Sequence, residues 1–171
     1  MREVEVGKLV KVADEEFIVL DKFGFSVLCL AKDFAYKNTR FDSDTNNYAE
    51  SEIRRKLNTE YLDKIVKSVG RLNIWDAEID LTSDDGLDDY DRVTDSVGLL
   101  TADMYRKYSR IIERYPVNDW WWLATPWSTP HRNVHRTVRR VNGGGALLRG
   151  DCGVDNGVRP FCIFSTSIFE S

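Results

Sequence analysis

The stretch that decides the fold is DWWWLATP, residues 119–126. Its run of consecutive apolar side chains would bury both faces of an extended strand, and the proline would end that strand. A strand of this kind belongs in the centre of a sheet. We therefore predict a buried central strand over residues 120–125, with Trp120, Trp121 and Trp122 as core side chains.

A second motif, GVRPF at residues 157–161, opens another apolar run near the C-terminus. We predict a closing strand over residues 157–165 and a further strand over residues 134–141, which precedes a flexible glycine turn at residues 143–145. Arg159 stands inside the GVRPF motif, so we expect it to be structural: a partly buried guanidinium that ties the terminal strand to loop carbonyls.

The N-terminal part alternates between short apolar runs and turns, and a first helix follows it. Residues 4–12, 16–21 and 26–31 are the apolar runs, and they predict three antiparallel strands. The helix is expected to start at residue 46 or 47 and to end near residue 70. Asn47 can cap it, and Glu50, three residues later, completes a capping box.

Thr101 is expected to cap a second helix that runs to about Tyr115, where Pro116 stops it. Between the two helices, residues 76–95 carry nine carboxylates and one arginine, which predicts an exposed loop. The period of the apolar pattern changes from two to 3.6 and back. The chain is therefore expected to form a single α+β domain over residues 1–171, with small antiparallel sheets flanked by two helices.

Length and composition are typical of a soluble globular protein, with 171 residues, 42% of them hydrophobic and 30% charged. No apolar run approaches the roughly twenty residues that cross a bilayer, so no membrane insertion is expected. The N-terminus has no signal-peptide pattern, which predicts synthesis in the cytosol or a place in a virion assembled there. Cys29, Cys152 and Cys162 have the spacing of neither a disulfide framework nor a zinc site, and we expect buried thiols.

The C-terminal quarter uses a restricted set of residue types. Residues 128–169 contain no Lys, Glu, Gln, Met or Trp, whereas residues 1–127 contain nine Lys, nine Glu, five Trp and two Met. All the positive charge of the stretch is arginine, although lysine serves as well on a solvated face. Folding requirements alone do not explain this restriction of residue types in residues 128–169.

Motifs for metal binding and covalent catalysis are incomplete. Asp42, Asp44 and Asn46 match the first three ligand positions of a calcium loop, but its glycine and its bidentate glutamate are missing, which favours a polar loop that feeds a helix cap. His131 and His135 have a metal-ligand spacing but lie in a segment that looks extended. No nucleophile signature surrounds a serine or cysteine. We therefore expect no metal, no cofactor and no enzymatic activity.

The Trp-rich stretch and the GVRPF motif together resemble a large bacterial and phage family of uncharacterised domains. Members of that family read Trp-Trp-Leu-Arg-Ser-Pro and then Gly-Val-Arg-Pro-Ala, and the likeness includes blocks in residues 17–30, 47–58 and 95–101. Ala124 and Thr125 depart from the Arg-Ser of the family. The family looks like a formylglycine-generating-enzyme-like branch of the C-type-lectin-like fold, so the resemblance implies that fold.

The same group includes the variable proteins of diversity-generating retroelements, whose ligand-binding residues lie just before a fixed terminal strand. In those systems, substitution of the adenines in AAC-type codons cannot produce Lys, Glu, Gln, Met or Trp, the five types absent from residues 128–169. The resemblance thus implies a diversified binding region in residues 127–156. The sugar-binding motifs of calcium-dependent lectins and the paired cysteines of formylglycine-generating enzymes are not matched.

We predict a non-enzymatic receptor-recognition protein that binds a protein or glycan, for example on a cell surface, through exposed side chains on one face. These side chains are Trp127, His131, Arg132, Asn133, His135, Arg136, Arg139, Asn142, Arg149, Asp151 and Asp155. Two alternatives are an enzyme related to formylglycine-generating or sulfatase-modifying proteins and a nucleic-acid binder that uses the tail arginines. The acidic pI, near 5.3, disfavours nucleic acid as a partner.

Overall fold

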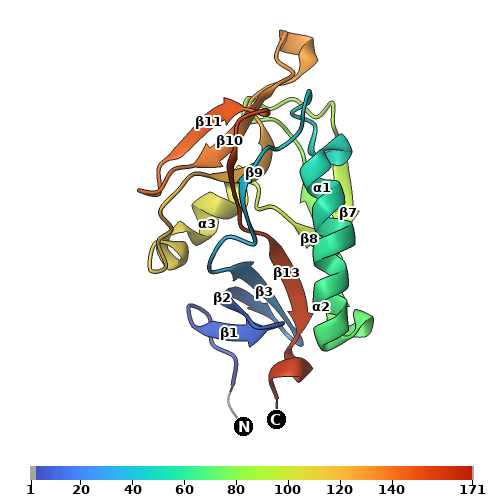
Figure 1. Ribbon diagram of the computed structural model, residues 1–171, viewed down its shortest axis with the longest axis vertical. Coiled ribbons are helices and arrows are strands. Elements are labelled where there is room, and N and C mark those ends of the chain that lie inside the picture. The colour runs from blue at the N-terminus through green and yellow to red at the C-terminus, as the bar shows by residue number, and fades with distance from the viewer. Residues whose placement is uncertain (1–2, 171) are drawn as a thin grey trace.

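An antiparallel meander opens the chain in the computed structural model, which describes residues 3–170 (Figure 1). Its strands are β1 (Leu9–Val12), β2 (Glu15–Phe23) and β3 (Ser26–Ala31), and their pairing confirms the predicted meander. The first strand begins at Leu9 rather than at residue 4. Gly7 has a φ of +86°, a left-handed turn conformation that interrupts the extended backbone before β1.

The last strand of the chain completes this first sheet. Strand β13 (Phe161–Ser165) pairs antiparallel with β3, and its other edge pairs with the short strands β5 (Ile74–Trp75) and β8 (Val97–Gly98). The order of the sheet is β1-β2-β3-β13-β5. The C-terminal strand therefore lies inside the sheet that the N-terminal strands begin.

The second sheet has the order β11-β10-β9-β12-β4 and contains the Trp-rich stretch at its centre. All six residues of β9 are buried, which confirms the predicted central strand. The strands are β4 (Tyr36–Thr39), β9 (Trp121–Pro126), β10 (Thr137–Val141), β11 (Leu147–Asp151) and β12 (Asn156–Val158).

Two sequence predictions about strands are wrong. The closing strand is not continuous: it breaks at Arg159 and Pro160 into β12 and β13, which belong to different sheets, and the proline supplies no N–H to a ladder. The acidic run is not only a loop, because it contains the antiparallel hairpin of β6 (Ala77–Asp80) and β7 (Arg92–Asp95). Because polar residues that face solvent alternate with the apolar ones in these two strands, the acidic run did not show a clear strand pattern in the sequence.

The first helical segment is interrupted. A 3-10 turn, Tyr48–Glu50, is capped by Asn47, and α1 (Glu52–Lys56), a π-helical turn (Leu57–Tyr61) and α2 (Leu62–Val69) follow. The predicted capping box is wrong because Ser51 is extended and separates the 3-10 turn from α1. Ser51 itself caps α1, and its Oγ accepts the N–H of Arg54 at 3.2 Å. Gly70 ends α2, as predicted.

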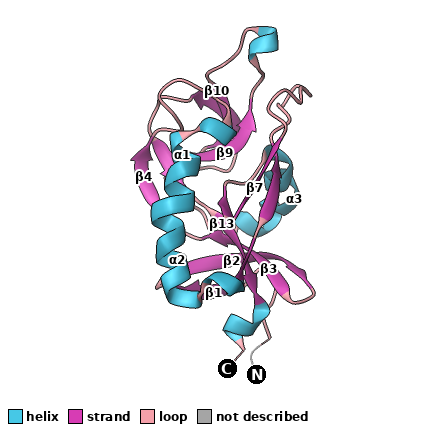
Figure 2. Cartoon of the chain, turned by 90° about the vertical axis from the view of Figure 1, so that its right-hand side faces the viewer, coloured by secondary structure: helices cyan, strands magenta, loops and turns pink. Residues whose placement is uncertain are grey.

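The second helix, α3 (Ala102–Ile112), begins at the predicted cap, where the Oγ1 of Thr101 accepts the N–H of Met104. It ends at Ile112 rather than Tyr115. Helix α3 and the column formed by α1 and α2 lie on opposite sides of the strands (Figure 1). The same column runs from the second sheet to the first (Figure 2). The buried apolar side chains of both sheets form one cluster.

Within residues 3–170, no helix combines the length and the apolar character needed to cross a membrane.

Candidate functional site

The predicted binding residues lie on the segment that leaves β9, forms the β10–β11 hairpin and returns as β12. Six of the eleven side chains are exposed, namely those of His131, Arg132, Asn133, His135, Arg149 and Asp155. Trp127, Arg136, Asn142 and Asp151 are half-buried. Arg139 is only 9% exposed, so its predicted exposure is wrong. It is covered because it packs against the Trp127 ring and the carboxylate of Asp84.

These residues do not gather at one point. Residues 131–133 belong to the projecting turn at the top of Figure 1. Arg136 forms a bidentate ion pair with Asp151 across the hairpin, with Nε–Oδ1 and Nη2–Oδ2 distances of 2.9 and 3.0 Å. Asn142 lies in the turn at the opposite end of β10, where it accepts the N–H groups of Gly144 and Ala146. The candidate surface therefore extends along the whole hairpin.

Two tryptophans at the ends of β9 pack against arginines of the hairpin. Arg139 and Arg149 are direct cross-strand partners, and their guanidinium carbons lie 5.1 and 4.4 Å from the centre of the Trp127 ring. Arg140 lies 3.9 Å from the centre of the Trp120 ring. Trp120 is half-buried, so its assignment to the core is wrong: it precedes β9 and its indole packs against Arg140. Trp121 and Trp122 are buried, as predicted.

The acidic loop between β6 and β7 holds the start of this segment. The carboxylate of Asp85 accepts hydrogen bonds from Ser83 and from Ser128, the latter at 2.7 Å, and lies 2.8 Å from Nη1 of Arg132. The hydroxyl of Thr129 donates to Asp89. The hydrogen bonds from Ser83 and Ser128, together with Arg132, lower the pKa of Asp85 to about 2. These contacts therefore stabilise the charged form of the Asp85 carboxylate in the loop.

The polar loop before α1 supports the same segment from the other side. The Nδ2 of Asn46, which is fully buried, donates to the carbonyls of Ser128 and Thr137, and its Oδ1 accepts from the hydroxyl of Tyr90. Asp42 accepts three backbone N–H groups, among them that of Glu52 in α1. These contacts confirm a polar loop that feeds a helix. In the described part of the chain, no group of three or more His, Cys, Asp or Glu residues could hold a metal ion.

All three cysteines are buried, as predicted. Burial raises the pKa of Cys152 to about 11 and raises the pKa of Cys29 and Cys162 above the ordinary range. A nucleophilic thiol needs the opposite shift, since the thiolate is the reactive form.

Arg159 bonds to backbone carbonyls, as predicted, but its guanidinium is fully buried rather than partly buried. It is 1% exposed, and it donates from Nε to the carbonyl of Ala31 and from Nη2 to the carbonyls of Lys32 and Tyr115, over distances of 2.9 to 3.4 Å. Its guanidinium also packs on the Trp121 ring. Burial lowers the pKa of Arg159 to about 10, so the side chain is charged at neutral pH. It links the turn between the two sheets to the end of β3.

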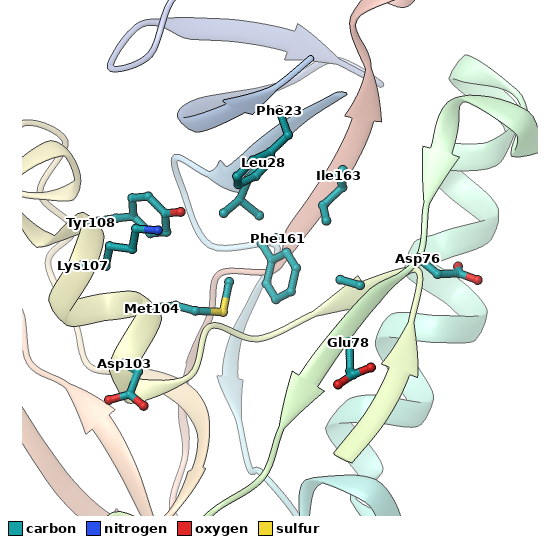
Figure 3. Close-up of a pocket in the computed structure, with 11 residues that line it drawn as sticks. Phe23, Leu28, Asp76, Glu78, Asp103, Met104, Lys107, Tyr108, Phe161 and Ile163 are labelled. Atoms are coloured by element: carbon teal, nitrogen blue, oxygen red, sulfur yellow. The ribbon is translucent and has the colours of Figure 1, made fainter. Parts of the chain in front are cut away.

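An apolar hollow of about 420 Å³ lies between α3 and the first sheet, away from the candidate surface (Figure 3). Met104, Phe161 and Ile163 are among its lining side chains, and none of its lining comes from residues 127–156. The carboxylates of Asp76 and Glu78 point away from the apolar side chains. Two of its ionisable lining residues, Lys107 and Tyr108, contact the carboxylate of Asp21, at 4.0 and 2.6 Å.

Sequence reasoning missed the role of Asp84, Asp85 and Asp89, which it assigned to a solvated loop. Acidic residues outnumber basic ones in residues 1–127, and arginines outnumber acidic residues in residues 128–171. This charge asymmetry is the signal that could have indicated pairing between these aspartates and the C-terminal segment.

One prediction concerns the pH dependence of stability. The pKa of Asp85 is lower in the folded chain than its ordinary value of 3.8, so its bonds stabilise the fold above that pH and are lost as the pH falls towards about 2. We expect Asp85→Asn to lose less stability than the wild type over this interval. Thermal unfolding at a series of acidic pH values measures the difference. Asp88→Asn is the control, because no hydrogen bond of the Asp88 carboxylate is found within residues 3–170.

Comparison of the chain with models of protein families, with curated proteins and with solved structures finds no match in any of the three. The function is therefore inferred from the residues of the surface itself.

Proposed function

We propose that the protein is a non-enzymatic ligand-binding module of C-type-lectin-like fold, whose binding surface is formed by residues 127–156. One observation carries the proposal. The stretch with the restricted residue types is also the stretch whose His131, Arg132, Asn133, His135 and Arg149 side chains are exposed, next to strands that are fully buried. Residue types chosen for a partner rather than for the core would be distributed in this way.

Hydrogen bonds and an ion pair hold the proposed binding surface in place, and this rigidity favours recognition of a partner. Ser128 is held by Asn46, which donates to its carbonyl, and by Asp85, which accepts from its hydroxyl. The hairpin is held by the ion pair of Arg136 with Asp151. Fixing the loop before binding reduces the conformational entropy that is lost when a partner binds. The half-buried Trp127 and the exposed Arg132 and Arg149 are residue types that dominate binding energy at protein interfaces.

Two alternatives fit these residues less well. An enzyme of the formylglycine-generating type would need a reactive cysteine, and burial raises the pKa of all three thiols. A nucleic-acid surface would need free cations, whereas Arg132 and Arg136 lie within 3.2 Å of carboxylate oxygens. The charges of these arginines are already matched inside the protein.

The ligand is proposed to be a protein or glycan on a cell surface, and the protein is proposed to be phage or bacterial and diversified by a retroelement. The nucleotide sequence around its gene tests this proposal. We expect a reverse-transcriptase gene nearby and a template repeat that matches codons 128–156 except at adenines. A neighbourhood with neither would contradict diversification, and the restricted residue types would need another cause.

A further inference from the structure

The hairpin carries two guanidinium groups with unused hydrogen-bond donors. Each guanidinium has five N–H donors, and within residues 3–170 neither Arg139 nor Arg149 donates a side-chain hydrogen bond. Arg149 is exposed, while Arg139 is 9% exposed. Nε of Arg139 is buried without a hydrogen-bond partner, and a buried donor in this state is costly unless a partner accepts its N–H.

The nearest carboxylate does not satisfy Arg139. Oδ1 of Asp84 lies 3.4 Å from Nε of Arg139, but the N–H is not aligned with it, and Nε counts among the buried atoms without a hydrogen bond. The same Oδ1 is 3.2 Å from Nη2 of Arg106, which donates to it. Asp84 is therefore shared, and Arg106 has the better geometry.

The local charge is also unmatched. Arg106 lies near the carboxylates of Asp84 and Asp103, and Arg139 shares Asp84. Within residues 3–170, Arg149 forms no ion pair, so its positive charge is left over beside Arg139. The pKa of Arg139 is lowered, first by burial and then by repulsion from Arg106 and Arg149 in spite of Asp84. One added negative charge would balance this group.

We infer that Arg139 and Arg149, beside Trp127, form a binding site for a carboxylate group of the ligand. The two arginines are cross-strand partners on one side of the hairpin, so both can present N–H groups to the same oxygens. A carboxylate is planar and singly charged, which matches the fork of a guanidinium and the single excess charge. The Trp127 ring packs against both guanidiniums, at 5.1 and 4.4 Å from its centre, and so holds them next to each other.

This inference rests on the proposed binding surface and names the chemistry that it recognises: an acidic side chain of a protein or an acidic sugar of a glycan. Acetate is the probe, because it carries the carboxylate and little else. Acetate replaces chloride at constant ionic strength while the Nε–H signals of a ¹⁵N-labelled sample are followed by NMR. We expect saturable shifts at Arg139 and Arg149 and none at Arg110, which is exposed on α3.

Three variants sharpen the test. Arg149→Gln, at an exposed position, should weaken acetate binding about tenfold or more. Arg110→Gln, at an exposed position on α3 outside the binding surface, should leave acetate binding unchanged. Asp84→Asn should strengthen acetate binding, because it removes the competing carboxylate beside Arg139. The melting temperature of each variant shows whether it is folded.

Several results would overturn the inference. They are the absence of a saturable shift at Arg139, an equal shift at Arg110, acetate binding that survives Arg149→Gln, and tighter binding of inorganic phosphate than of acetate. The gene-neighbourhood test of the proposed function does not depend on any of these measurements. Failure of the carboxylate site and failure of the binding surface are therefore distinguishable.

Discussion

Trp122→Ala should lower the free energy of unfolding by about 3 to 5 kcal/mol, the usual cost of deleting a large core aromatic. Trp122 is fully buried at the centre of the second sheet, and its ring lies 5.7 Å from that of Phe41. Its Nε1 also donates to the carbonyl of Thr39 at 2.9 Å, so the substitution leaves an acceptor in β4 without its partner. Denaturant unfolding measures the loss.

Trp75→Ala is the matched control for this prediction. Trp75 lies in the first sheet but is 45% exposed, and we expect a much smaller loss than at Trp122. Equal losses at the two positions would mean that the Trp-rich strand is not the centre of the core.

Arg159→Ala should lower the free energy of unfolding by about 2 to 4 kcal/mol, because the buried carbonyls lose their hydrogen-bond donor and stay without a partner. The guanidinium donates hydrogen bonds to the carbonyls of both Ala31 and Lys32, and it packs against the Trp121 ring. Arg159→Lys should recover only part of the loss, since a single ammonium lacks the planar fork that reaches both carbonyls.

Thermal and denaturant unfolding of the two Arg159 variants give the measurement. Retention of full stability in Arg159→Ala, together with loss of ligand binding, would assign Arg159 to the binding surface and contradict a structural role.

The parts of the fold that the sequence predicts are those in which one local signal acts alone. DWWWLATP is apolar without interruption, and β9 is the buried centre of its sheet. Thr101 is a good N-cap before an amphipathic run, and α3 starts there. The failures are positions where two local signals compete. Asn47 and Ser51 can each cap a helix, and the chain uses both, in two separate turns.

The candidate site was predictable in its location but not in its geometry. The restricted residue types locate residues 127–156, yet they do not indicate which side chains pair within the protein. Arg139 and Arg149 are cross-strand partners, but only Arg139 is buried, because Asp84 from the loop between β6 and β7 lies against it. Contacts between residues so far apart in sequence form only in the tertiary structure. Local sequence patterns therefore do not predict them.

The most direct test of the central claim compares two libraries that are displayed on yeast. In both, six positions are randomised with codons that end in C, and the surviving fraction after protease treatment reports folding. One library varies the exposed residues His131, Arg132, Asn133, His135, Arg149 and Asp155. The other varies the buried residues Val138, Arg139, Val141, Cys152, Asn156 and Val158. We predict that most members of the exposed library resist the protease and that few members of the buried library do; equal loss of folding in the two libraries would contradict a binding surface that varies on a fixed scaffold.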